Sequence, residues 1–409
     1  SGPQAGEALR ALSGSLPTPR RATLRTLRDP DRSGTLDRAL LLWFPGPDTA
    51  TGEDLAEIHA HGGRAVVRAI ESALDVLPGL RRAEPGEFTR RSLMNGRIDL
   101  AEAEGLADLL SAETESQRKA ALSLASGGLS RFVEDWQARL LSLSAQVEAL
   151  LDFSDEEDVG AGTMAIGNII SQCQLLECEW RQWLARALAE RLTDGLVVVI
   201  AGPPNAGKST LLNALAQREA AIVSPIAGTT RDIVEVPIAI EGIPFRFADT
   251  AGLRDGSNDP IEAIGMARAA ELIDRSDMLL WLGTDETAPV HPHLLCVAAK
   301  ADLHVGDCDE RSGEAVALSA VTGAGMDELY RWLRVTARNL LPVEGETLLH
   351  RRHRAALSDA TESLTDCSLD PLILAEQLRH ARLSIDTITG RSGTEAMLDA
   401  LFGRFCIGK

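Results

Sequence analysis

A glycine-bounded loop lies between a buried strand-like run and the start of a helix. Residues 202–209 read Gly-Pro-Pro-Asn-Ala-Gly-Lys-Ser, directly after the apolar run 196–201. This is the pattern G-x-x-x-x-G-K-[ST] in the context it requires, with a helix expected over Ser209–Ala216. The backbone N–H groups of such a loop cradle phosphate oxygens, and the helix N-terminus that follows favours negative charge. The loop therefore predicts a nucleotide phosphate site, because a turn that only connects a strand to a helix does not need the lysine.

Composition limits the other classes of function. The chain has 409 residues, which predicts two or three domains, and its net charge is −19. A chain this acidic does not bind nucleic acid through its overall field, so an RNA substrate needs a local basic patch or a basic partner. Aromatic residues make up 4% of the chain, which argues against a stacking surface for single strands. The candidate basic patches, for each of which a solvated face is the plainer interpretation, are Arg81-Arg82, Arg90-Arg91 and Arg351-Arg352-His353-Arg354.

Six cysteines are scattered along the chain without any C-x-x-C pair. This spacing argues against a zinc site and against a disulfide framework. The sequence contains no signal peptide and no apolar run of about 18 residues, which a membrane helix needs. We therefore expect a cytoplasmic protein that does not use a membrane. Because the sequence begins Ser-Gly-Pro without methionine, we also expect a further N-terminal piece to precede it.

The pattern of apolar residues divides the chain into parts. Residues 1–96 mix short apolar runs with Gly and Pro turns, which indicates a small α/β domain. Residues 97–193 and 342–409 have helical periodicity, with helices expected over 98–110, 122–153 and 372–388. Residues 194–341 alternate strand and helix, and the strand-like runs are 196–201, 233–240, 245–248, 278–282, 294–298 and 315–318. We therefore predict a multidomain α/β and all-α protein in which an open α/β sheet, covered by helices on both faces, is inserted into one discontinuous helical domain.

Segments downstream of the loop complete the predicted nucleotide site. Lys208 can reach the β- and γ-phosphates, and the Ser209 hydroxyl can ligate Mg²⁺. Gly228-Thr-Thr-Arg-Asp232 offers a threonine that closes over Mg²⁺. Asp249-Thr-Ala-Gly252 supplies a carboxylate on the Mg²⁺ side and a glycine N–H that senses the γ-phosphate. In this order and spacing, the segments resemble the GTPase class of switch proteins.

The base-recognition segment departs from that class at one position. GTPases of this class carry Asn-Lys-x-Asp after a strand, and the Asp accepts hydrogen bonds from guanine. Here the run 294–298 is followed by Ala299-Lys300-Ala301-Asp302. We expect Asp302 to provide selectivity for guanine. We also expect a reduced affinity for the guanine nucleotide, because Ala replaces Asn. Ser319-Ala320 resembles the last element of the class, whose backbone contacts the base.

A second departure concerns hydrolysis. Position 253 is Leu, where Ras-like enzymes carry a Gln that orients the attacking water. Because Leu cannot orient water, another group must do so, and the candidates that follow it are Asp255, Asp259 and Glu262.

Motifs along almost the whole chain resemble the MnmE (TrmE) family of tRNA modification GTPases. Asn205 lies within the phosphate loop, and the C-terminus reads Phe405-Cys-Ile-Gly-Lys409. Outside the G domain, the matching segments are Thr51-Gly-Glu-Asp54, His59-Ala-His-Gly-Gly63, Pro85-Gly-Glu-Phe88 and Asn95-Gly-Arg-Ile-Asp-Leu-Ala-Glu-Ala-Glu104. The terminal motif and the N-terminal set are far more specific than the phosphate loop. Ala50 departs from the family, which has an aromatic residue before Thr-Gly-Glu-Asp.

The resemblance implies an architecture and a reaction. It implies an N-terminal folate-binding domain over residues 1–96 that forms a homodimer, a helical domain over 97–193 and 342–409, and an inserted Ras-like G domain over 194–341. It also implies a flavoprotein partner of the MnmG type, which binds FAD and forms a heterotetramer with this chain. Together the two proteins add a carboxymethylaminomethyl or aminomethyl group at C5 of the tRNA wobble uridine. The one-carbon unit comes from 5,10-methylene-tetrahydrofolate, for which 5-formyl-tetrahydrofolate is an analogue, and K⁺ activates GTP hydrolysis when two G domains meet.

The resemblance also assigns roles to residues of this sequence. It makes Asn205, Ser224, Ile226 and Thr229 ligands of a K⁺ ion that takes the place of an arginine finger. It makes Ser209 and Thr230 ligands of Mg²⁺, and gives Glu262, Lys208 and Thr230 catalytic roles in hydrolysis. It places folate contacts on Glu57, Arg97 and Lys409, and on an arginine of a first strand that would precede Ser1. The residues expected around GTP are Asn205, Ala206, Gly207, Lys208, Ser209, Thr210, Ser224, Pro225, Ile226, Ala227, Gly228, Thr229, Thr230, Asp249, Thr250, Ala251, Gly252, Lys300, Asp302, Ser319 and Ala320.

Three alternatives stay open from the residues themselves. Cys406 is either a nucleophile or redox group, or a small buried hydrophobe at a helix end. A GTPase that assembles with ribosomal RNA, as in the Era and Der families, shares the phosphate loop, but those families typically add basic RNA-binding domains. A folate-binding protein with a vestigial G domain is compatible with Ala299, yet Lys208, Ser209, Thr230 and Asp249 are all intact.

Overall fold

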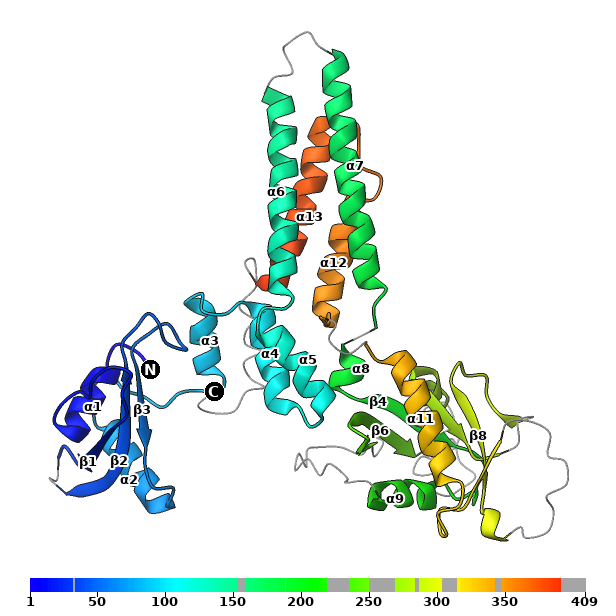
Figure 1. The fold of residues 1–409 in the computed structure, drawn as a ribbon, viewed down its shortest axis with the longest axis horizontal. Helices are drawn as coiled ribbons and strands as arrows, with labels where there is room; N and C mark the ends of the chain where they lie inside the picture. The colour runs from blue at the N-terminus through cyan, green and yellow to red at the C-terminus, as the bar shows by residue number, and fades with distance from the viewer. Residues whose placement is uncertain are drawn as a thin grey trace, which may run out of the picture. The chain divides into compact units, whose positions relative to one another are not determined.

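The computed structural model describes residues 1–31, 34–152, 159–187, 189–218, 235–249, 269–283, 287–303, 315–342 and 347–390 (Figure 1). Its contacts divide the chain into two compact units. The first unit contains Ser1–Ala107, Ala125–Ala138 and Ile385–Lys409, and the second contains Asp108–Leu124 and Arg139–Ser384. Since the second unit combines the nucleotide sheet with most of the helical bundle, this division does not test the predicted domain boundaries, which stay predictions.

The first unit is built on a small antiparallel sheet. Its strands β1 (Thr23–Arg28), β2 (Thr35–Phe44) and β3 (Leu55–His59) pair in the order β1-β2-β3. Alternate residues of β2, namely Ala39, Leu41 and Trp43, are buried and form the core with α1 (Ala5–Ser13) and α2 (Arg64–Asp75). Gly6 of α1 allows the close contact, because a Cβ atom there would lie 3.1 Å from the Trp43 ring. The helix α3 (Glu87–Met94) follows in the chain.

A six-stranded sheet carries the phosphate loop in the second unit. The strand order is β5-β6-β4-β7-β8-β9, and all neighbours are parallel except β5 with β6, which are antiparallel. This is the Ras-like α/β fold predicted from the sequence. The strands are β4 (Leu196–Ala201), β5 (Glu235–Ile240), β6 (Ile243–Asp249), β7 (Met278–Trp281), β8 (Leu294–Ala299) and β9 (Val316–Leu318).

Both faces of this sheet are covered by apolar side chains. On one face, Val198 and Ile200 pack with α9 (Lys208–Arg218) and α11 (Met326–Leu340). On the other face, Val199 and Ala201 pack with Leu272 and Ile273. Burial on both faces explains why β4 reads as a continuous apolar run, which is typical of the centre of a parallel sheet.

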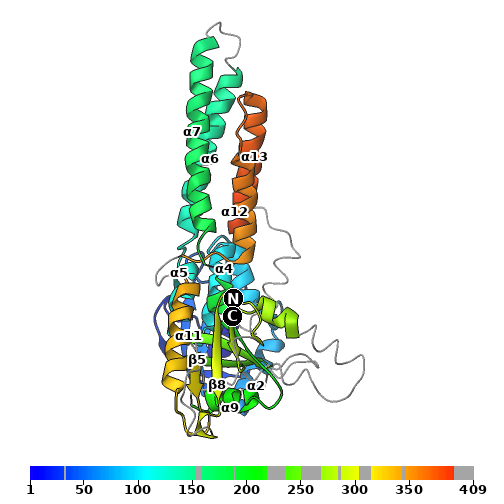
Figure 2. The ribbon, with the colours of Figure 1, turned by 90° about the vertical axis from the view of Figure 1, so that its right-hand side faces the viewer.

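Long helices form a bundle in which α6 (Ser130–Asp152), α7 (Val159–Leu184), α12 (Arg351–Leu364) and α13 (Pro371–Thr389) run side by side (Figures 1 and 2). Arg139 of α6 donates to Glu179 of α7 across 2.7 Å. The buried residues of α7 are spaced three or four apart, as an amphipathic helix requires: Ile169, Cys173, Leu176, Trp180 and Trp183. Because α7 precedes the six-stranded sheet in the chain and α12 follows it, the G domain is inserted between two helices of the bundle.

One predicted helix is divided in two. The run 122–153 was expected to be continuous, but α5 (Glu115–Ala125) ends before α6 begins at Ser130. Gly127 lies in the connection with φ of 75°, a left-handed conformation that glycine adopts without strain. The helix α4 (Leu100–Ser111) comes before α5. None of the helices in the described ranges combines the length and the hydropathy needed to cross a membrane.

Candidate nucleotide site

The phosphate loop joins β4 to α9 and depends on left-handed backbone. Gly202 has φ of 146°, and a Cβ atom there would lie 2.6 Å from the carbonyl oxygen of Leu282. Gly207 has φ of 98°, and Asn205, which tolerates this region better than most residues, has φ of 60°. These positions curl the loop, so the glycines at both ends of the motif are required by geometry.

Lys208 places its ammonium inside the curled loop. The side chain is 6% exposed, and Nζ donates to the carbonyl oxygens of Gly202 at 3.1 Å and Pro203 at 2.9 Å. An ionised phosphate is a stronger acceptor for an ammonium than a neutral carbonyl. The loop therefore holds a cation where the β- and γ-phosphates are expected.

Two side chains whose oxygen atoms can ligate a metal ion meet beside the loop, at the predicted Mg²⁺ position. Ser209, in the first turn of α9, donates from Oγ to Oδ2 of Asp249 across 2.6 Å. Asp249 ends β6, which is the parallel neighbour of β4. Mg²⁺ prefers oxygen ligands and usually takes only one or two from the protein, with substrate phosphates and waters completing its shell. The pair fits this requirement, and within the described ranges no group of three or more His, Cys, Asp or Glu side chains forms a fuller metal cage.

The base-recognition segment is tied directly to the phosphate loop. Lys300 follows β8 with φ of 62°, and its Nζ donates to the carbonyl oxygen of Asn205 across 2.7 Å. Ala299 faces the same loop, since its Cβ lies 3.9 Å from the position that a Cβ on Gly207 would occupy. Asp302 follows in the 3₁₀ turn Ala301–Leu303. The hydrogen bond from the lysine of the motif to the phosphate loop is thus present, whereas Ala299 has no polar side chain that could form another.

The last predicted element forms a tight turn after β9. Ser319 is fully buried, and its backbone N–H donates to the carbonyl oxygen of Ala324 at 2.9 Å. Its Oγ accepts from the N–H of Thr322 at 3.2 Å. These bonds fix the backbone at Ser319 and Ala320, which the sequence assigned to base contact.

A pocket of about 610 Å³ opens beside the phosphate loop, where β4, β7 and β8 end. The carboxyl ends of parallel strands are the usual ligand edge of such a sheet. The loop contributes Gly202, Pro203 and Ala206, and the base segment contributes Ala299 and Lys300. Trp281, Gly283 and Thr287 also line this pocket, and sequence reasoning missed them. A tryptophan at the end of a buried strand-like run was the signal that could have identified this wall.

Several predicted site residues lie outside the described residues. They are Ser224, Pro225, Ile226, Ala227, Gly228, Thr229, Thr230, Thr250, Ala251, Gly252, Leu253, Asp255, Asp259, Glu262, Cys406 and Lys409. Thr210, by contrast, is an exposed residue of the first turn of α9. The structure therefore brings together the phosphate loop, Asp249 and the base segment.

Two of the predicted folate residues, Glu57 and Arg97, are each engaged in a separate ion pair of the first unit. Glu57 of β3 lies 3.0 Å from Nε2 of His59, and Arg97 lies 3.5 Å from Asp48. A pocket of about 410 Å³ in the same unit is lined by Ala56 and Ile58, which flank Glu57 in the strand and so point to the opposite face. Arg81, Arg82 and Arg91 line this pocket together with apolar side chains.

Three of the arginines predicted as candidate basic patches in this unit, Arg81, Arg82 and Arg91, are paired with carboxylates. Arg82 contacts Asp75 at 3.1 Å, and both Arg81 and Arg91 contact Glu87. The hydrogen bond from Arg81, reinforced by Arg91, lowers the pKa of Glu87 to about 2. These guanidinium groups therefore stabilise the fold around α3 as well as contributing positive charge.

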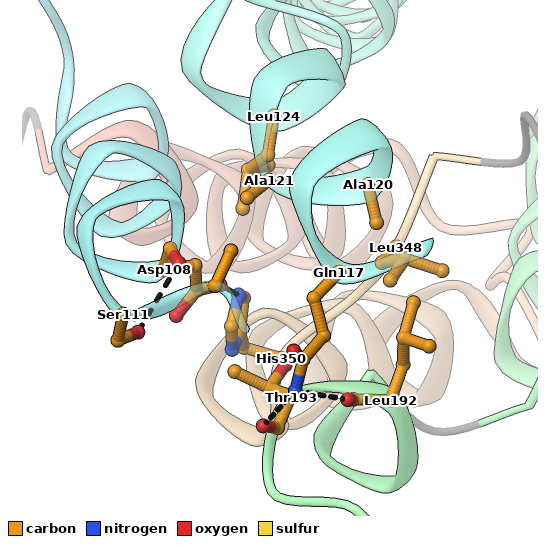
Figure 3. Close-up of a pocket in the computed structure, with 11 residues that line it drawn as sticks. Asp108, Ser111, Gln117, Ala120, Ala121, Leu124, Leu192, Thr193, Leu348 and His350 are labelled. Carbon is orange, nitrogen blue, oxygen red and sulfur yellow. Dashed lines mark hydrogen bonds and ion pairs between the residues drawn. The ribbon is translucent and has the colours of Figure 1, made fainter. Parts of the chain in front are cut away.

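The segments that enter and leave the G domain line one small cavity together with the buried side chain of Gln117 (Figure 3). Gln117 of α5 donates from Nε2 to the carbonyl oxygens of Leu192 at 3.1 Å and Thr193 at 2.9 Å. Those residues end α8 (Glu190–Thr193), just before β4. His350, which caps α12 after the G domain, lies 3.0 Å from Asp108 of α4 across the same cavity of about 20 Å³. The segment that enters the G domain is thus held by α5, and the segment that leaves it is held by α4.

Comparison with known proteins gives matches over the whole chain. A family model described as "GTP-binding protein TrmE N-terminus" matches residues 1–97, and one described as "MnmE helical domain" matches residues 100–406. The tRNA modification GTPase MnmE of Sphingopyxis alaskensis is 58% identical over 417 residues, covering 100% of this chain and 99% of the relative. The protein of the same name from Novosphingobium aromaticivorans is 54% identical and covers 100% of this chain and 95% of the relative. Among solved structures, the G domain of the T. maritima FeoB iron transporter is 23% identical, with a TM-score of 0.24, and covers 35% of this chain and 98% of that one.

Proposed function

The chain belongs to the MnmE family of tRNA modification GTPases, and we propose from this membership that it is a K⁺-activated GTPase that modifies the tRNA wobble uridine. With an MnmG-type FAD protein, it adds a carboxymethylaminomethyl or aminomethyl group at C5, using a one-carbon unit from 5,10-methylene-tetrahydrofolate. The observation that carries the GTPase part is the Lys208 ammonium held inside a curled loop beside the Ser209–Asp249 pair. Hydrolysis drives a conformational cycle, and the chemistry on the base takes place elsewhere.

The chain's own residues have defined tasks toward GTP. Lys208 neutralises charge on the β- and γ-phosphates, and the loop N–H groups orient them. Ser209, with Thr230, would hold Mg²⁺, and the bound ion would offset the negative charge of the phosphates. Lys300 stabilises the loop through the carbonyl of Asn205, while Asp302 accepts from guanine. Steady-state hydrolysis of GTP by the wild-type chain and by Lys208→Ala tests this part, and equal rates would overturn it.

The K⁺ proposal is supported by the position of Asn205. Asn205 is an exposed residue of the phosphate loop. A K⁺ ion bound by its side chain together with Ser224, Ile226 and Thr229 would offset charge that develops between the phosphates. Turnover should be strongly higher in KCl than in NaCl. Asn205→Gly keeps the left-handed backbone and removes the ligand, so it should lose this preference while still binding GDP. Equal rates of the wild-type chain in the two salts would rule out the K⁺ mechanism.

The water-orienting role is proposed for Glu262, because Leu253 cannot perform it. Glu262→Ala should slow hydrolysis and leave GTP affinity nearly unchanged, since the residue acts on the attacking water. Asp259→Ala removes another candidate of the same segment and should hydrolyse normally, whereas slow hydrolysis by this variant alone would assign the role to Asp259. A parallel loss of GTP binding in Glu262→Ala would assign that residue a structural role.

Folate binding is proposed for Glu57, Arg97 and Lys409. The ligand 5-formyl-tetrahydrofolate should raise the Tm of the wild-type chain, and this rise should vanish in Arg97→Ala. Arg82→Ala changes the pocket on the other face of β3 and is the control. A rise that survives in Arg97→Ala but vanishes in Arg82→Ala would move the folate site to that pocket.

The remaining parts of the proposal concern partners and place. We propose a homodimer through the N-terminal domain, a heterotetramer with the MnmG-type protein, a cytoplasmic location, and the three-domain division at residues 96, 193 and 341. Cys406 is proposed as a reactive group near the base chemistry, which the variant Cys406→Ser tests by separating modification from GTP turnover. Assembly with ribosomal RNA is the competing function, and it predicts co-purification with ribosomal particles instead of altered tRNA.

A further inference from the structure

Large apolar side chains are exposed where α13 begins. Leu369, in the connection between α12 and α13, is 68% exposed. Leu372 and Ile373, in the first turn of α13, are 68% and 52% exposed. A single exposed apolar residue is ordinary, whereas a group of them with a polar rim is typical of a binding surface. None of the three lines the nucleotide pocket or is a predicted folate residue.

A cavity of about 470 Å³ lies between the end of α12 and the start of α13. The last turns of α12 line it with Glu362 and Ser363. The lining residues of α13 recur three or four positions apart, so they share one face of the helix: Leu372, Ile373, Glu376, Gln377 and His380. An open groove of this kind, formed by two helices and partly apolar, can accept the apolar face of a further helix. We call it the α12–α13 groove.

Hydrogen bonds fix the shape of the α12–α13 groove. Gln377, which lines it, accepts from the N–H of Ser368 at 2.9 Å and donates to the carbonyl oxygen of Asp366 at 3.4 Å. In the same connection, Thr365 donates from Oγ1 to Oε1 of Glu177 on α7 across 3.0 Å. The connection is therefore held to both α13 and α7, and an occupant does not have to order this surface when it binds.

The rim of the groove is acidic. Arg379 and His380 both contact the carboxylate of Glu376, at 2.6 and 2.9 Å, so charges at this position offset one another. Glu362 and Asp366 form no ion pair with any residue in the described ranges. Carboxylates of this kind repel the phosphates of RNA and of anionic lipids, and they attract lysine and arginine side chains. The charge of the rim therefore favours a basic protein segment as the occupant.

We propose that the α12–α13 groove binds a helix of another protein. Apolar side chains of that helix pack on Leu369, Leu372 and Ile373, and lysines or arginines that flank them contact Glu362 and Asp366. The apolar contact supplies the affinity, because it removes exposed surface from water. The charges speed the encounter and orient the helix. The inference rests on the helical bundle alone and holds whether or not the chain modifies tRNA.

The first test measures binding of a fluorescein-labelled helical peptide to the full chain. The probe consists of leucine and lysine, with leucines three or four positions apart on one face. It should bind the wild type, and the double variant Leu372→Lys, Ile373→Lys should weaken binding at least about tenfold. Leu175→Lys is the matched control, because Leu175 is an apolar residue of α7 that is 65% exposed, and it should bind as the wild type does. Every variant should keep the wild-type Tm, since the substituted side chains are largely exposed.

The charges are tested with the same peptide. The double variant Glu362→Gln, Asp366→Asn should bind more weakly at low salt and lose less affinity than the wild type when NaCl is raised. A peptide with glutamate in place of lysine should not bind. The proposal is overturned if the wild type does not bind the leucine–lysine peptide, if the groove variants bind it as the wild type does, or if Leu175→Lys weakens binding equally.

Photo-crosslinking in the cells from which the gene comes tests the natural occupant. The photoreactive residue p-benzoylphenylalanine replaces Leu372 in one full-length variant and Leu175 in the control, and the cross-linked peptides are sequenced. Position 372 alone should capture a segment of another protein whose apolar residues lie three or four apart and are flanked by lysine or arginine. Capture of a second copy of this chain, of RNA or lipid, of an acidic segment, or of nothing would overturn the proposal.

Discussion

The Ser209 hydroxyl donates to the Asp249 carboxylate across 2.6 Å, so the phosphate-loop helix and the end of β6 are joined where Mg²⁺ is expected. Asp249→Asn keeps a hydrogen-bonding side chain but removes the charge that attracts the metal. Nucleotide affinity in Mg²⁺ should therefore fall at least tenfold, a loss of about 1.4 kcal/mol. In EDTA, the variant and the wild type should bind alike. A fluorescent GTP analogue titrated under both conditions measures this difference, and an equal loss in EDTA would show that Asp249 only stabilises the fold.

Restoring a polar side chain at position 299 should tighten nucleotide binding. Ala299 ends β8 against the phosphate loop, so the side chain of Ala299→Asn can reach backbone groups of the loop. One added hydrogen bond contributes about 1 kcal/mol, which lowers the Kd for GDP roughly fivefold. Ala301→Asn, two residues away in the 3₁₀ turn, is the control and should bind as the wild type does. Weaker binding by Ala299→Asn would mean that the loop has no room for the amide.

Gln117→Leu should destabilise the segment that leads from α8 into the G domain. The substitution preserves side-chain size but leaves the carbonyl oxygens of Leu192 and Thr193 without their donor in a buried site. Each unsatisfied buried polar group costs about 1–3 kcal/mol. We expect a lower Tm and faster amide exchange in α8 and at the start of β4. Gln182→Leu, an exposed change on α7, should alter neither measurement. Unchanged exchange in Gln117→Leu would mean that other contacts hold this segment.

The ion pairs of Glu87 predict a pH dependence for the first unit. Arg81 and Arg91 lower the pKa of Glu87 from 4.5 to about 2 in the folded chain. A carboxyl group with a lowered folded pKa adds stability above its unfolded pKa and loses it as the pH falls toward its folded pKa. Stability should therefore fall between pH 4.5 and 2, and Glu87→Gln should remove that part of the dependence. At pH 7 the variant should lose about 1–3 kcal/mol, measured by urea unfolding. Identical pH profiles for variant and wild type would contradict this assignment.

Much of the G domain was predictable because its motifs are local. The strand predicted over 196–201 coincides with β4, since a strand buried on both faces must be apolar throughout. The break between α5 and α6 was missed, because the apolar periodicity of the sequence continues through Gly127. The helical backbone is interrupted there, since Gly127 has a left-handed conformation. Trp281 and Gln117 were also missed, since their roles depend on residues that only tertiary structure brings near.

Mass spectrometry of tRNA nucleosides tests whether this GTPase serves the modification of the tRNA wobble uridine. Cells that lack the gene are complemented with the wild-type chain, with Lys208→Ala or with an empty vector. We expect C5-substituted wobble uridines to disappear in the empty-vector cells, to return with the wild type and to stay absent with Lys208→Ala. Unchanged levels of these nucleosides in cells without the protein would contradict it.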